Sequence, residues 1–248
     1  MIRHHISFWI FTSLLVIFIT GCAKEYSIEG NTVTVSDYYP TTIGTYWVYE
    51  DDNTGDTFTM SVINHDTSIN NKIFRSIQSD DPFQHPDILI AKQTGNYFTR
   101  SKTLNDLLGT VGGGTPLPIT IPDSILNREE TILKDYVANG SLWNHDFSLQ
   151  VTSPPAPLPP LPITVTVQVR YSITEKAVSK TINGFTFPDV ITVRTEIAAV
   201  IPVIGTQNIL IMDNSYARGV GPIRQQITIN AGTPTTTGYS IHNYHVTP

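Results

Sequence analysis

The longest uninterrupted alternation in the sequence runs over residues 163–173. Every second side chain there is apolar and the ones between are Thr, Gln, Arg or Ser, the apolar set being Ile163, Val165, Val167, Val169, Tyr171 and Ile173. Successive side chains of a β-strand point to opposite faces of a sheet, so this pattern indicates a long strand with one buried face. A chain that contains such a strand needs a sheet around it, which restricts the fold to β-rich classes.

Shorter segments of the same kind occur along most of the chain. They are bounded by turn residues, and strands are expected at 46–49, 57–62, 73–77, 88–92, 96–99, 185–187, 191–197, 208–212, 223–229 and 239–246. Only 104–108 and 123–133 suggest short helices. About a dozen strands at this spacing predict a mostly β fold, with a single antiparallel barrel-like or half-barrel domain over 37–248 and at most one or two short helices.

Two pairs of short motifs recur in the same order. Gly-Thr-Tyr-Trp at 44–47 is echoed by Gly-Ser-Leu-Trp at 140–143, and the Asn-containing turn within 69–74 is echoed within 182–187. A proline-rich insertion near 153–162 would account for much of the longer spacing in the second half. Two explanations stay open: two related β-meanders, or chance recurrence of common turn residues.

The start of the chain has the pattern of an exported protein. A short basic segment precedes an apolar run over 6–19, which has the length of a signal peptide but is too short to span a bilayer. The residues that follow, Ile19, Thr20, Gly21 and Cys22, resemble the lipobox of bacterial lipoproteins. The resemblance implies removal of residues 1–21 and acylation of Cys22, which is the only cysteine of the chain.

Acylation would place the mature protein on a membrane, with residues 22–36 as the lipidated end and its tether. Two acyl chains give stable anchoring. Ala23 stands where some inner-membrane lipoproteins have Asp, so we expect the outer membrane, on its periplasmic or cell-surface face. Lys24 and Glu25 weakly favour the cell surface.

Composition excludes some classes of partner. The chain carries 15 basic and 21 acidic residues without a basic cluster, which makes it a poor candidate for binding nucleic acid. We find no cofactor-binding motif, no Walker-type loop and no hydrolase or zinc-protease signature. Adjacent carboxylates such as Glu129 and Glu130 would diverge on a strand, so we expect no catalytic residues and no metal site.

Proline-bearing apolar segments are the most unusual feature. Prolines cannot donate hydrogen bonds to a ladder, so these segments belong at sheet edges, bulges or loops. Their apolar side chains are candidates for the rim of a ligand cavity or for a contact with a partner; the candidates are Leu117, Ile119, Leu158, Leu161, Val200 and Ile204. The alternative is that they simply cover the open ends of the barrel.

Three further motifs resemble those of a group of uncharacterised bacterial lipoproteins. They are Tyr-Pro-Thr-Thr-Ile-Gly-Thr-Tyr-Trp-Val-Tyr at 39–49, Gly-Phe-Thr-Phe-Pro-Asp-Val at 184–190 and Tyr-Ala-Arg-Gly-Val-Gly at 216–221. Such proteins look like the incomplete β-barrels of the LolA/LolB type, in which a curved antiparallel sheet holds an apolar cavity. The resemblance implies a fold more than a function.

We therefore expect a lipid-anchored, non-catalytic envelope protein that binds an apolar or lipid-like molecule. The first alternative is a structural lipoprotein that docks an envelope protein through the proline-rich edges. The second is a glycan-binding accessory, for which Tyr46, Trp47, Tyr49 and Trp143 would supply a stacking platform, although aromatic residues on strands are more often core.

Overall fold

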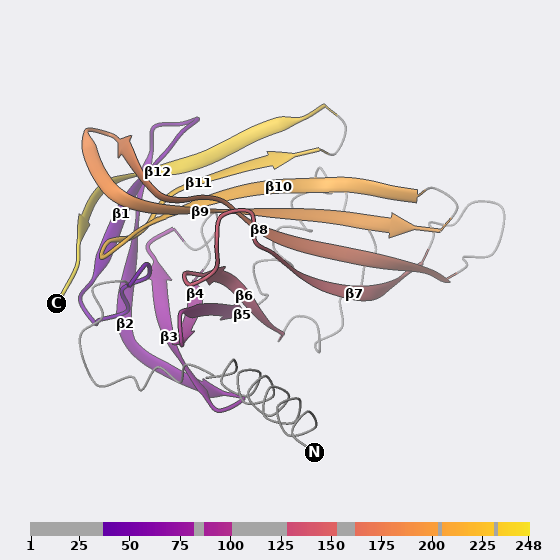
Figure 1. The fold of residues 1–248 in the computed structure, drawn as a ribbon, viewed down its shortest axis with the longest axis horizontal. Helices are drawn as coiled ribbons and strands as arrows, with labels where there is room; N and C mark the ends of the chain where they lie inside the picture. Colours follow the sequence, from indigo (N-terminus) through magenta and orange to yellow (C-terminus); the bar gives the residue numbers. More distant parts are fainter. Residues whose placement is uncertain (1–36, 82–86, 101–127, 153–161, 203–204, 231–232) are drawn as a thin grey trace, which may run out of the picture. The chain divides into compact units, whose positions relative to one another are not determined.

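The computed structural model describes residues 37–81, 87–100, 128–152, 162–202, 205–230 and 233–248. Every regular element in these ranges is a β-strand (Figure 1). The first six strands are β1 (Tyr46–Asp51), β2 (Thr57–Ile69), β3 (Lys72–Ser79), β4 (Ile88–Gln93), β5 (Asn96–Arg100) and β6 (Glu129–Lys134). The other six are β7 (Leu142–Thr152), β8 (Pro162–Ile182), β9 (Phe185–Ile201), β10 (Gly205–Ala217), β11 (Gly221–Ile229) and β12 (Thr235–His245). These ranges contain no helix long and apolar enough to cross a membrane.

All twelve strands belong to one antiparallel sheet, in the order β6-β5-β4-β3-β2-β1-β12-β11-β10-β9-β8-β7. Two meanders of six strands, β1–β6 and β7–β12, therefore lie side by side. They are joined where β1 pairs with β12. The predicted mostly β, antiparallel barrel-like fold is confirmed.

The two meanders begin alike. Gly44 donates its amide hydrogen to the Val62 carbonyl on β2, and the Val62 amide returns a bond to Thr45. At the start of β7, Gly140 and Ser141 make the same pair of bonds with Ile173 on β8. The next turns also match, because their central residues, Asn70-Asn71 and Asn183-Gly184, all have positive φ as a tight hairpin requires. The recurring sequence motifs thus mark two related meanders.

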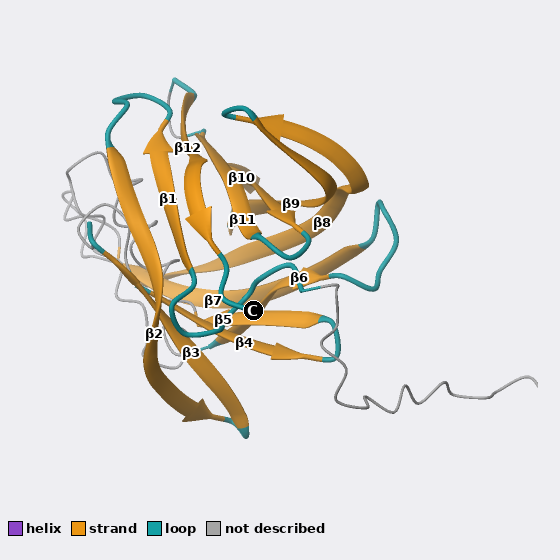
Figure 2. Ribbon diagram, turned by 90° about the vertical axis from the view of Figure 1, so that its left-hand side faces the viewer, coloured by secondary structure: helices purple, strands orange, loops and turns teal. Residues whose placement is uncertain are grey.

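The sheet curls until its two edge strands meet (Figure 2). β6 and β7 make no ladder with each other, but the indole nitrogen of Trp143 on β7 donates to the Thr131 carbonyl on β6 at 2.7 Å. The Arg128 guanidinium likewise donates to the Asp146 carbonyl at 3.1 Å. We call this contact between β6 and β7 the seam; it makes the sheet a nearly closed barrel.

The short helix expected through Leu133 is wrong over 129–133, which lies in β6. The apolar spacing there fits a helix only partly, and the segment instead pairs with β5, where a register shift between Tyr97 and Phe98 accommodates its irregular pattern. Pairing with a neighbouring strand overrides weak local preference.

The 163–173 alternation is confirmed within β8: Val167, Val169, Tyr171 and Ile173 are buried. Beyond Ile173 the ladder between β8 and β9 shifts register three times, and Ala177 adopts φ 54°. Such irregularities bend a strand. The tip of this hairpin reaches β12, where Phe185 packs against Tyr244 with 5.7 Å between ring centroids.

Candidate functional site

The inner face of the curled sheet lines a partly open cavity of about 120 Å³. Five tyrosines line it: Tyr39, Tyr49, Tyr171, Tyr216 and Tyr239. The other lining side chains are apolar (Met60, Ile88, Ile90, Ile132, Met212, Pro222) or polar (Thr99, Glu130, Thr195, Asn214, Gln225). They come from both meanders, so the site exists only in the curled sheet.

Alternation along the strands decides which side chains face the cavity. On β10, Met212 and Asn214 line it, whereas Asp213 between them points to the opposite face and forms a two-bond ion pair with Arg194 at 2.9 and 2.8 Å. On β6, Glu130 lines the cavity, whereas Glu129 binds Lys72 at 2.8 Å. The predicted divergence of the two adjacent glutamates is therefore confirmed.

One end of the cavity carries a buried polar group of three residues. Thr99 on β5 and Glu130 on β6 are direct cross-strand partners, with 7% and 9% of their surface exposed. The Tyr171 hydroxyl, from β8, donates to Glu130 Oε2 at 3.0 Å. The Thr99 hydroxyl has no hydrogen-bond partner among the described residues.

Several other polar groups of the lining bind one another. The Tyr49 hydroxyl donates to the Pro222 carbonyl at 2.9 Å, and the Gln225 amide donates to Asn214 Oδ1 at 2.9 Å. Burial raises the pKa of all five tyrosines, so they are neutral phenols over the physiological pH range. The lining thus offers aromatic faces, aliphatic groups and neutral hydroxyls, with Glu130 as its ionisable carboxyl group.

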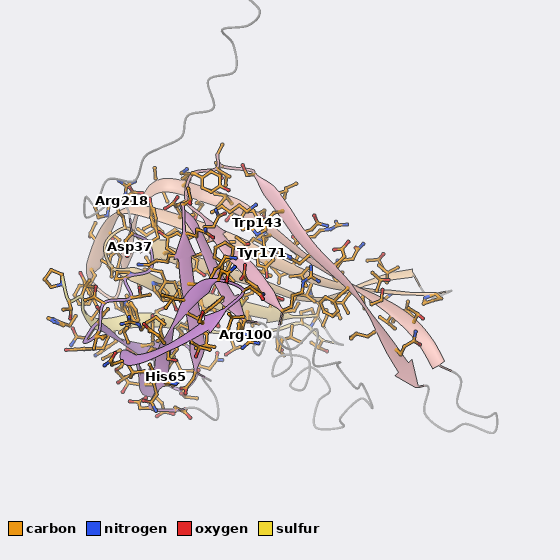
Figure 3. The ribbon with its side chains drawn as sticks, turned by 90° about the horizontal axis from the view of Figure 1, so that it is seen from below. Asp37, His65, Arg100, Trp143, Tyr171 and Arg218 are labelled. Carbon is orange, nitrogen blue, oxygen red and sulfur yellow. The ribbon has the colours of Figure 1, made fainter. Side chains whose placement is uncertain are left out.

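The seam borders this site. The Trp143 ring stacks on Tyr171, with ring centroids 5.5 Å apart and planes 4° apart, and the Lys134 ammonium lies 5.3 Å from the Trp143 ring centroid (Figure 3). The Tyr171 hydroxyl in turn donates its hydrogen bond to Glu130. The side chains that latch β6 to β7 are therefore in contact with the polar end of the cavity.

A second concave region lies on the opposite face of β9–β11. One of the cations that line it, Lys180, contacts Glu175 at 2.5 Å, Thr192 at 2.9 Å and Ser215 at 3.3 Å. Thr192 also donates to Glu175 at 2.7 Å. This network ties the bent end of β8 to the outer face of β9 and β10, so we assign it a structural role.

Three sequence motifs meet beside the cavity. Trp47 packs edge-on against Tyr39 with 5.8 Å between ring centroids, and its indole nitrogen donates to the Val220 carbonyl at 2.6 Å. The Tyr38 hydroxyl donates to Asp189 at 2.8 Å, and Asp189 forms an ion pair with Arg218 at 2.7 Å. The motifs at 39–49 and 216–221, which lie in different meanders, therefore contact each other directly, and Tyr38, just before the first motif, binds Asp189 of the motif at 184–190.

Most of the rim candidates lie outside the described residues: Leu117, Ile119, Leu158, Leu161 and Ile204, together with Cys22 and the proline-rich stretch 153–161. Val200 lies near the end of β9, opposite Thr166 on β8 and Thr206 on β10. The cavity is lined by other residues. The sequence had pointed to Tyr49 as part of an aromatic platform and to Glu130 as one of two diverging carboxylates, but to neither as a cavity residue.

The proposed aromatic platform does not form. Trp47 and Tyr49 are buried in the core, Tyr46 stacks on His245 with 5.7 Å between ring centroids, and Trp143 lies at the seam. Among the described residues, no three His, Cys, Asp or Glu side chains are grouped so as to hold a metal ion.

Comparisons with known proteins give only distant likenesses. No protein-family profile matches the chain, and no curated protein matches it. A solved structure named "putative lipoprotein", from Parabacteroides distasonis, has 16% identity and a TM-score of 0.49, covering 85% of this chain and 99% of its own. A "putative exported protein with YmcC-like fold" from Bacteroides fragilis has 12% identity and a TM-score of 0.35 over 85% and 99%. The "hypothetical lipoprotein YmcC" from Escherichia coli has 10% identity and a TM-score of 0.32 over 83% and 88%.

Proposed function

We propose that this protein is a lipid-anchored cell-envelope protein that binds a small, largely apolar molecule inside its curled sheet, without chemical change. The observation that carries the proposal is the interior cavity, which has aromatic and aliphatic walls and a polar group at one end. Apolar walls with a few placed polar groups are typical of ligand sites.

The volume of the cavity limits the size of the molecule that it can hold entirely. Ligand pockets usually measure about 300–1,000 Å³, whereas a cavity of about 150 Å³ binds benzene. The cavity here, about 120 Å³, suits a molecule of that size or one end of a larger molecule. For a lipid-like ligand, only one end would be enclosed.

The chemistry of the lining favours binding over catalysis. Retaining and inverting glycosidases need two carboxyl groups facing one another, whereas the described lining residues include Glu130 as their one carboxyl group. The described lining also lacks histidine, cysteine and lysine, the usual bases and nucleophiles. Hydrogen bonding and apolar contact remain as its means of recognition.

The lipid anchor is supported by the sequence around Ile19, Thr20, Gly21 and Cys22. An apolar run of signal-peptide length comes directly before this motif. Acylation of Cys22 would hold the domain at a membrane surface of the envelope, and the outer membrane is our proposal for which membrane.

Native mass spectrometry of the lipoprotein, purified from its membrane and compared before and after organic extraction, tests the binding proposal. We expect a small bound species that extraction removes. Met212→Phe, which fills the cavity from β10, should abolish it, whereas Ile211→Phe on the opposite face of β10 should retain it. A bound species equally abundant in both variants, or none in the wild type, would contradict interior binding; the second result would favour a docking role.

A further inference from the structure

We propose that the ligand presents a hydroxyl group, which is held between Thr99 and Glu130 at the polar end of the cavity. The inference rests on the proposed function, because it names the chemistry of the molecule that the same cavity binds.

The Thr99 hydroxyl is buried and has no hydrogen-bond partner among the described residues. An unsatisfied buried polar group costs folding free energy, and native structures contain few of them. Thr99 is one of the residues that line the cavity, so its hydroxyl lies next to the space that a ligand would fill. A polar atom of the ligand is the partner that the geometry offers.

Glu130 determines which polar group of the ligand would suit the position next to Thr99. It stands directly opposite Thr99 on the neighbouring strand, where facing Cβ atoms are about 4.5–5.5 Å apart. An oxygen atom placed between the two side chains is then within hydrogen-bond reach of both. A hydroxyl group suits this position because it accepts a bond from the Thr99 O–H and donates its own proton to the carboxylate.

The surroundings favour a neutral hydroxyl over an ammonium group. Arg128 directly precedes β6 and Lys134 ends it, and both are close enough to lower the pKa of His145 across the seam, after the larger effect of burial. The Tyr171 hydroxyl already donates to Glu130. The carboxylate therefore has positive charge and a donor near it, and a cationic ligand would add repulsion from Arg128 and Lys134.

Phenol and toluene make a matched pair of probes, since a hydroxyl group replaces a methyl group on one ring of suitable size. We would measure binding by calorimetry to the full lipoprotein in nanodiscs, with empty nanodiscs as the reference. Phenol should bind at least about tenfold more tightly than toluene, because a hydrogen bond to a charged group typically contributes a factor of that order or more. Benzylammonium should bind more weakly than phenol.

Two variants locate the effect. Thr99→Val keeps the shape of the side chain and removes the unsatisfied hydroxyl, so it should erase most of the preference for phenol while leaving the melting temperature equal or higher. Glu130→Gln should also reduce the preference, since the amide can turn a donor toward the ligand. Tightened binding of phenol in either variant would overturn the proposal.

The remaining outcomes separate this inference from the proposed function. Equal binding of phenol and toluene would overturn the hydroxyl proposal, would place water between Thr99 and Glu130, and would leave interior apolar binding standing. If benzylammonium bound most tightly of the three probes, the hydroxyl proposal would be overturned in favour of a ligand that presents a cationic group. Failure of all three probes to bind, with no co-purifying species, would overturn both.

Discussion

A Cβ atom built on Gly221 would lie 2.9 Å from Cζ2 of Trp47. Gly221 begins β11 and has φ 110°, a backbone conformation open to glycine and strained for other residues. Trp47, which is fully buried, reaches from β1 across to the β10–β11 turn and binds the Val220 carbonyl. Position 221 therefore requires glycine for two reasons: its backbone conformation would strain another residue, and a side chain would collide with the Trp47 ring.

Gly221→Ala should destabilise the fold by about 2–4 kcal/mol, as the sum of backbone strain and a displaced indole ring. Gly219→Ala is the matched control: Gly219 lies in the same turn with φ 71°, but a Cβ there meets no atom within 4 Å. It should cost only about 1–2 kcal/mol. Urea unfolding of both variants measures the difference, and equal losses would show that the contact with Trp47 contributes nothing.

Acylation of Cys22 is tested by metabolic labelling with radioactive palmitate in a bacterial host. The wild type should carry label and stay with the membrane after a high-salt wash, because buried methylenes contribute about 0.8 kcal/mol each. Cys22→Ala should lose both properties, and Ser27→Ala should keep them. Label retained in Cys22→Ala would place the lipid elsewhere.

Alternation of apolar and polar residues predicted most of the strands, because each of these strands buries one face. β7 was not among the predicted strands. The repeat left a sequence signal as well, since Gly44 and Gly140 begin the two meanders and both have positive φ, but that signal alone did not exclude chance recurrence of turn residues. β6 could not be predicted as a strand, because the apolar side chains around Ile132 fit neither the two-residue period of a strand nor the 3.6-residue period of a helix. Its pairing with β5 depends on a register shift that no local pattern encodes.

The candidate site was harder to predict than the fold. Thr99, Glu130 and Tyr171 come from three strands, and Glu130 and Tyr171 are 41 residues apart in sequence. Only the curling of the sheet, which brings β6 to the β7–β8 edge, places them together. The sequence signal that existed was the divergence of Glu129 and Glu130 on a strand, which indicates a carboxylate on each face without saying which face encloses a cavity.

His145, on β7 at the seam, should make stability depend on pH. Burial, and then the positive charge of Arg128, lower its pKa below the ordinary value of 6.5. Below about pH 6.5 the unfolded chain therefore binds a proton that the folded protein does not, and stability falls as the pH drops toward the lowered pKa. His145→Gln removes this contribution, so the loss of stability between pH 7.5 and 5.5 should be smaller than in the wild type. Urea unfolding at both pH values measures it; an unchanged or steeper loss would show that His145 does not destabilise the protonated fold.

The seam itself is tested at Trp143. Trp143→Phe removes the hydrogen bond to Thr131 and weakens the stacking on Tyr171, which together should cost about 2 kcal/mol. Leu142→Ala is the neighbouring control, because Leu142 is 76% exposed and its loss should cost less than about 0.5 kcal/mol.

Hydrogen exchange separates a local effect of Trp143→Phe from a global one. β6 pairs through its backbone with β5 alone. Without the hydrogen bond from Trp143 to Thr131, the amides of β6 should therefore exchange faster, while those of β1 and β12, which are paired on both sides, stay protected. Because Trp143 stacks on Tyr171, which binds Glu130 in the cavity wall, a ligand bound in the cavity should also dissociate faster from Trp143→Phe than from Leu142→Ala. Equal acceleration of exchange in all strands would mean that Trp143 supports the whole sheet, and unchanged exchange in β6 would mean that the seam is held by other contacts.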